Sequence, residues 1–263
     1  MTARRLLLRM DEFAALCADL TAELPVAFVP VPTADASTVA SSTVGSSAVA
    51  SLLEVARTCL TERGITGNAY DAVAANLRLF AAAHIVITVD VVVDDESLLG
   101  LVCLADHGGA TLVHTQGGAV ELSLWDIGNL AIELGRVVPP STASTRATSR
   151  AVDAHALVTA LALDTGGHHE VAVQALRREG LSLLEAADVL AVAATTYGSM
   201  HCVVTDRDSR RPQEVTVAHV VWILTRDGWL GLRRQARGAI EMTPVSPADL
   251  GTFVAPFLAA TIS

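Results

Sequence analysis

A five-residue segment that occurs twice constrains the fold of this chain more than any other feature. Residues 118–122 read Gly-Ala-Val-Glu-Leu, and residues 238–242 read Gly-Ala-Ile-Glu-Met, 120 positions further on. Two further pairs have the same spacing, Gly108 with Gly228 and Leu130 with Leu250. A constant spacing over this length indicates internal duplication of one structural unit.

The hydrophobic pattern predicts the same order of elements around each copy. In the first copy, helices are predicted at residues 48–63 and 68–83, strands at 84–93, 98–106, 110–115 and 119–123, and a closing helix at 126–137. In the second copy, helices are predicted at 151–163, 168–179 and 182–195, strands at 199–206, 215–225, 229–235 and 239–243, and a last helix from 246. Gly64 and Gly180 stand where helices are expected to stop, and turns typical of hairpins separate the strands.

This repeated order predicts an α+β fold made of two similar units. The units are expected at residues 1–138 and 151–263, joined by a Ser/Thr/Pro-rich linker at 139–150. Each unit has a sheet face and a helical face, which the pair can bury together around a pseudo-twofold axis.

The beginning of the chain is expected to extend the first unit. A strand at residues 5–9 and a helix capped by Asp11 and running to about residue 23 are predicted to complete a sheet. Residues 24–32 read as an extended apolar segment. Residues 33–47 are rich in Ser, Thr and Ala, and are predicted to form a loop.

Charge and hydropathy exclude two classes of partner. The net charge of −10 argues against nucleic acid. No apolar run approaches the roughly 20 residues that cross a bilayer, so no membrane association is predicted. Residues 1–8 resemble the start of a signal peptide, but Arg9 and Asp11 cut the apolar region short, and the protein is predicted to be cytoplasmic.

Few residues suggest metal or thiol chemistry. The four cysteines lack paired spacing and are read as buried free thiols. His168 and His169 are adjacent, so on a helix they point about 100° apart and make poor joint ligands. His201 and His219 lie on predicted strands and could approach each other across the sheet, although packed or edge histidines are favoured over metal ligands.

The sequence contains no catalytic or nucleotide-binding motif, so no cofactor, no metal and no enzymatic activity are predicted. Asp94, Asp95 and Glu96 form an acidic turn, which reads as a solvated hairpin tip or, alternatively, as carboxylates for acid–base work. Arg207, Arg210 and Arg211 form a basic counterpart in the second copy.

The two copies differ in charge. Residues 85–125 hold six acidic and no basic residues, whereas residues 205–240 hold seven arginines and four acidic residues. This contrast can orient a polar protein partner or favour self-association as a homodimer. Drift on two solvated faces is the alternative interpretation.

Three short segments of the second copy resemble the end of the EspG family. They are Val-Val-Trp-Ile-Leu-Thr-Arg-Asp-Gly-Trp at 220–229, Arg-Gly-Ala-Ile at 237–240 and Pro-Ala-Asp-Leu at 247–250. The opening, from Asp-Glu-Phe at 11–13 to Leu-Pro at 24–25, is also similar to that family. The resemblance implies a pseudo-twofold α+β fold with two antiparallel sheets and two helical bundles.

The resemblance also implies a function. The family consists of actinobacterial cytosolic chaperones of type VII secretion, which bind PE–PPE heterodimers at the apolar tip of the PPE helices and keep them soluble until export. The client-binding loop of the family maps to Asp94, Asp95, Glu96 and Ser97, which form a very short loop here, and its second helical bundle maps to residues 168–195. A small-molecule or metal-binding enzyme of unrecognised type is the alternative hypothesis.

Overall fold

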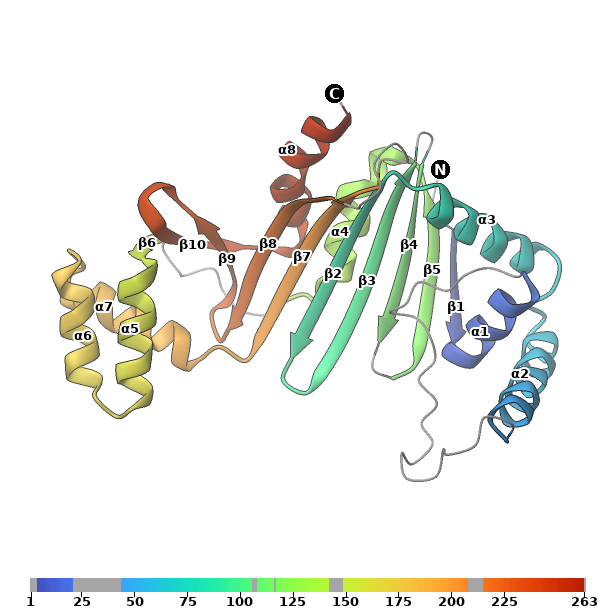
Figure 1. The fold of residues 1–263 in the computed structure, drawn as a ribbon, viewed down its shortest axis with the longest axis horizontal. Helices are drawn as coiled ribbons and strands as arrows, with labels where there is room; N and C mark the ends of the chain where they lie inside the picture. Colours follow the sequence, from blue (N-terminus) through green and yellow to red (C-terminus); the bar gives the residue numbers. More distant parts are fainter. Residues whose placement is uncertain are drawn as a thin grey trace. The chain divides into compact units, whose positions relative to one another are not determined.

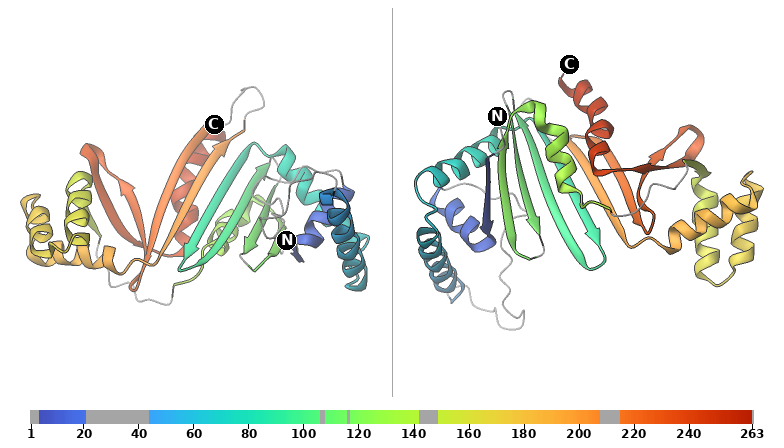
Figure 2. Two further views of the ribbon diagram at one scale, coloured as in Figure 1. Left: turned by 60° about the horizontal axis from the view of Figure 1, so that its bottom comes forward. Right: turned by 180° about the vertical axis from the view of Figure 1, so that it is seen from behind.

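The computed structural model describes residues 4–20, 44–105, 108–115, 117–141, 149–207 and 215–262 (Figures 1 and 2). The chain divides into two compact units. Unit 1 comprises residues 1–86, 98–130 and 207–213, and unit 2 comprises residues 87–97, 131–206 and 214–263. Strands are antiparallel in every pairing described below, which confirms the α+β class. The predicted division into repeats at 1–138 and 151–263 stays a proposal about the duplication.

Unit 1 places helices against a group of antiparallel strands. Its strand order is β1 (Arg4–Arg9), β5 (Ala119–Trp125), β4 (Gly108–Thr115) and β3 (Glu96–Ala105). Its helices are α1 (Met10–Asp19), α2 (Val44–Glu62) and α3 (Asn68–Ala82), of which α3 packs on β4 and β5. Three residues on the inner face of α3, Val73, Leu77 and Phe80, lie in the core with Phe13 and Leu112.

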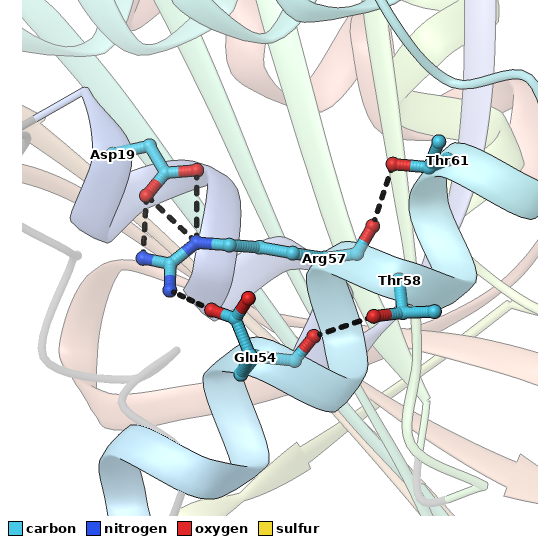
Figure 3. A network of polar contacts seen from close by, with 5 residues as sticks. All are labelled: Asp19, Glu54, Arg57, Thr58 and Thr61. Atoms are coloured by element: carbon cyan, nitrogen blue, oxygen red, sulfur yellow. Dashed lines mark hydrogen bonds and ion pairs between the residues drawn. The ribbon is translucent and has the colours of Figure 1, made fainter.

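An arginine ties α1 to α2 at the surface of unit 1 (Figure 3). Arg57 Nη2 lies 2.6 Å from Asp19 Oδ1, and Arg57 Nη1 lies 3.1 Å from Glu54 Oε2. The hydroxyls of Thr58 and Thr61 donate to backbone carbonyls one turn back in α2. The side-chain hydrogen bond to Asp19 raises the pKa of the Arg57 guanidinium.

A second arginine of this region pairs with a buried carboxylate. Glu12 is 0% exposed, accepts from the Arg9 backbone N–H at 2.8 Å and forms an ion pair with Arg63. Arg63 Nη2 also donates to the Leu7 carbonyl at 3.0 Å. Arg63 thus joins the end of α2 to β1 and α1.

Replacing Arg63 by methionine is expected to lower the free energy of unfolding by about 2 kcal/mol, because Glu12 then keeps a buried charge without its counter-ion. The half-exposed position of Arg63 keeps the loss below that of a fully buried pair. Urea denaturation measures the change. Arg57→Met, on the helix that ends just before Arg63, is the matched control, and its exposed pairs predict a much smaller loss. Equal losses in the two variants would show that the Glu12 pair has no special role.

Unit 2 has the strand order β2 (Ile85–Val93), β7 (Gly198–Asp206), β8 (Val215–Thr225), β9 (Gly228–Arg234), β10 (Ala239–Val245) and β6 (Arg150–Asp153). Helix α8 (Leu250–Ile262) packs on β7 and β8. The rings of Phe253 and Trp222 lie edge to face there, with their centroids 5.7 Å apart. Helix α4 (Leu130–Val137) approaches α8 so closely that a Cβ on Gly251 would lie 2.8 Å from that of Ala131. The bundle helices α5, α6 and α7 of this unit are described below with the candidate site.

The strand pairings of the two copies have identical registers at the predicted spacing. Leu112 pairs with Leu122 as Leu232 pairs with Met242, and Ala105 pairs with Gly108 as Thr225 pairs with Gly228. Gly118 and Gly238 both adopt positive φ, at 75° and 86°. A side chain is strained there, which explains why glycine occupies both positions.

The duplication extends to the first strand and helix of each copy. Arg9 pairs with Ala119 as Asp153 pairs with Ala239, and a helix begins at the next residue in both cases. The prediction that the N-terminal strand completes a sheet is therefore confirmed, because β1 pairs with β5.

Several predicted boundaries were wrong. Residues 151–153 form strand β6 and not the start of a helix, because they pair with β10. Helix α1 begins at Met10, before Asp11, and α2 begins at Val44, inside the predicted loop at 33–47. A short 3-10 helix, η2 (Ile127–Asn129), precedes α4 after Asp126, and η4 (Pro247–Asp249) precedes α8. The predictions for residues 21–43 and 142–148 lie outside the described residues.

Candidate protein-binding site

The predicted binding loop is a tight turn at the end of β2. Only Asp94 and Asp95 form the turn, whereas Glu96 and Ser97 already belong to β3. Asp94 adopts φ 51°, and its backbone N–H donates to the Tyr197 carbonyl at 2.8 Å. All four predicted residues are exposed. The turn is thus a short, acidic tip and not an extended arm.

The predicted second bundle consists of three helices of unit 2: α5 (Ala154–Thr165), α6 (His169–Arg178) and α7 (Leu183–Ala194). Figure 1 shows α5 and α6 side by side, joined by a short connection. Gly167 and Gly180 have φ of 82° and 96°, which lets the chain turn back after α5 and α6. Arg150 Nη2 lies 2.7 Å from Asp188 Oδ2, and this ion pair connects β6 to α7.

The start of α7 is fixed by a reciprocal cap. The Ser182 hydroxyl accepts from the Glu185 N–H at 3.2 Å, and the Ser182 N–H donates to Glu185 Oε2 at 2.8 Å. This arrangement is a capping box, in which Ser182 is the N-cap residue. The Ser182 hydroxyl and N–H hold the pKa of the Glu185 carboxyl below its ordinary value.

The bundle has a small core and exposes several large apolar side chains. Ala160, Val173, Leu176 and Leu190 are buried against one another and against Met242 of β10. However, each of the three helices also exposes at least one large apolar side chain to solvent. These are Val158 (65% exposed), Val171 (54%), Leu183 (59%) and Leu184 (72%). These four make up a third of the twelve exposed large apolar side chains of the described residues, so the bundle is enriched in them.

Exposed side chains of this size favour burial against a partner, because water is released from apolar surface on contact. Leu183 and Leu184 are adjacent at the first turn of α7, where the Ser182 cap fixes the backbone. We call the four exposed residues Val158, Val171, Leu183 and Leu184 the bundle apolar set. Periodicity could not single them out, because apolar positions on a helix are ordinarily taken as core.

The adjacent histidines His168 and His169 are not brought together at one site. His169 Nδ1 lies 2.6 Å from Asp164 Oδ1, and His168 precedes α6, so the adjacent histidines share no ligand. In the described ranges no three His, Cys, Asp or Glu side chains are placed to hold a metal ion. Arg207 is exposed at the end of β7, and Arg210 and Arg211 lie outside the described residues.

The cysteines are free thiols, as predicted, and three of the four are buried. Burial raises the pKa of Cys17 and of Cys202 to about 12, and raises that of Cys103 as well. Such thiols stay protonated and unreactive near neutral pH. Cys59 is partly buried.

These observations define an α+β protein whose helical bundle exposes four large apolar side chains. Within the part of the chain that the structure describes, no helix is long and apolar enough to span a membrane. The family model of the EspG family matches residues 9–255, and the chain therefore belongs to the EspG family.

A solved structure with the same fold supports this assignment. It is the Mycobacterium tuberculosis type VII secretion system chaperone EspG5 in complex with a PE25–PPE41 dimer. The similarity covers 98% of this chain and 96% of that chain at 14% identity, with a TM-score of 0.63. No curated protein sequence matches the chain significantly.

Proposed function

We propose that this protein is a cytoplasmic chaperone of type VII secretion that binds a PE–PPE heterodimer and keeps it soluble before export. The observation that carries this proposal is the family match over residues 9–255. The fold shared with EspG5, which was solved with its PE25–PPE41 dimer bound, supports the same partner class.

The bundle apolar set supplies a physical basis for the interaction. A helical client with an apolar tip is prone to aggregate, and the exposed leucines of α7 offer matching apolar surface. We propose that the acidic tip, Asp94, Asp95, Glu96 and Ser97, forms a further part of the binding site. Its two-residue turn has a short reach, so the bundle is expected to supply most of the contact area of about 800 Å² per partner.

Chaperoning of this kind requires no bond to be made or broken, and we propose that the protein is not an enzyme. The buried thiols support this view. The protein holds its client by surface burial alone.

Co-expression with a PE–PPE pair from the source genome, beginning with the pair encoded nearest to this gene, tests the proposal. We expect one stable complex of the three chains on size-exclusion chromatography with light scattering, and we expect the pair to precipitate when it is expressed alone. An unrelated, soluble two-helix heterodimer is the control and should elute separately. If none of the PE–PPE pairs co-elutes, the proposed function is wrong.

A further inference from the structure

Two histidines come together on the strands of unit 2, apart from the bundle helices. His201 lies on β7 and pairs with Val221, whereas His219 lies on β8 and pairs with Val203, so the histidines are diagonal neighbours. His201 Nδ1 and His219 Nε2 are 3.4 Å apart, and the ring centroids are 5.6 Å apart. Each ring thus directs a nitrogen toward the other.

Both rings are open to solvent on one face of the strands. Successive side chains of a strand point to opposite faces, and Trp222, which packs on Phe253 of α8, alternates with the histidine positions along β8. His201 likewise stands between the buried residues Met200 and Cys202. The histidines therefore lie on the face away from α8 and are exposed.

The separation of the two nitrogens matches the bite of a metal ion. Two imidazole nitrogens bound at about 2.0–2.1 Å in a tetrahedral arrangement are about 3.4 Å apart. The observed 3.4 Å equals this value. We propose that His201 and His219 chelate one divalent transition-metal ion, such as Zn²⁺, on the exposed face of β7 and β8.

Metal binding would fix the tautomer of each ring. Neutral imidazole offers one lone pair, so the ion would be bound by Nδ1 of His201 and Nε2 of His219, with the other nitrogen of each ring protonated. The ring of His169, in contrast, already contacts a carboxylate, because its Nδ1 lies 2.6 Å from Asp164 Oδ1. In the described ranges, neither His201 nor His219 forms an ion pair with a carboxylate.

The chemistry of the pair selects the class of ion. Imidazole nitrogens suit Zn²⁺, Ni²⁺ and Cu²⁺, whereas Mg²⁺ and Ca²⁺ require oxygen ligands. Because no third His, Cys, Asp or Glu joins the pair within the described part of the chain, water completes the coordination sphere. The site therefore binds reversibly, unlike a structural zinc site with four protein ligands.

Calorimetric titration of the tag-free protein with ZnCl₂ tests this inference and does not depend on the secretion function. We expect one Zn²⁺ per chain. His201→Gln and His219→Gln are each expected to weaken binding by at least about tenfold, because each removes one of only two ligands. The double variant His168→Gln, His169→Gln is the matched control and should bind like the wild type. MgCl₂ should produce no binding heat.

Long-range proton–nitrogen spectra of the imidazoles give a second readout. Substoichiometric Zn²⁺ is expected to shift the ring nitrogens of His201 and His219 and to leave those of His155 in place. Melting temperatures without metal should be the same for wild type and variants, because both rings are exposed. The inference is overturned if the wild type binds no Zn²⁺ at about 1 mM. It is also overturned if His201→Gln and His219→Gln leave the affinity unchanged.

Discussion

Replacing Leu183 and Leu184 together by aspartate is expected to weaken the complex with a PE–PPE heterodimer by more than about a hundredfold. The two side chains are 59% and 72% exposed, so they are available for burial in the complex. Loss of two central apolar contacts, with charges introduced in their place, corresponds to about 3 kcal/mol or more. Calorimetry or surface plasmon resonance with the purified heterodimer measures the change.

The fold itself should tolerate this double change. Leu183 and Leu184 occupy the first turn of α7, after the Ser182 cap, where a negative charge interacts favourably with the helix dipole. Ile132→Asp is the matched control, because Ile132 is also apolar and 60% exposed but belongs to α4. If the double variant binds as tightly as the Ile132 variant, the start of α7 is outside the interface. The chaperone function would then still stand, since it rests on the wild-type complex.

Gly109→Ala is expected to lower the free energy of unfolding by about 3 kcal/mol, which is at the upper end for overpacking. A Cβ on Gly109 would overlap the ring of Trp125, the residue that pairs with Gly109 across the strands. This ring cannot move aside easily, since it is buried and its Nε1 donates to Thr111 Oγ1 at 2.9 Å. Urea denaturation followed by tryptophan fluorescence measures the loss.

Gly117→Ala is the matched control for this prediction. A Cβ there would meet only Thr115 Oγ1, at 3.8 Å, so the expected change is within about 0.5 kcal/mol. The second copy places its large ring on the other strand of the same pair, as Trp229 opposite Val245. If Gly109→Ala lowered the free energy of unfolding no more than Gly117→Ala does, the ring of Trp125 would be able to repack around the added methyl group.

Most of the fold could be predicted from sequence because its signals are local. Gly64, Gly118 and Gly180 mark turns that need positive φ, and the strand β8 was predicted at residues 215–225, which are its observed bounds. Strand β6 was missed because three or four residues show no period, and its conformation is set by pairing with β10. The N-terminal boundary of α2 was missed because Ser- and Ala-rich sequence is compatible with both loop and helix.

The candidate site was less predictable, because it depends on which apolar residues remain outside. Leu183 and Leu184 fit a helical pattern in the same way as the buried Val189 and Leu190. Only tertiary packing separates the two pairs. The approach of His201 to His219 could be suggested from their strands, but the diagonal pairing depends on a register that sequence alone does not fix.

The end strands β1 and β6 affect how this protein behaves at high concentration. An open strand is a template on which another chain can add, which is a route to aggregation. β1 carries Arg5 and Arg9, and the carbonyl of Leu7 is already occupied by Arg63. β6 has only four residues and leads directly into α5. The protein thus presents few free backbone groups at these two strands on which another chain could add.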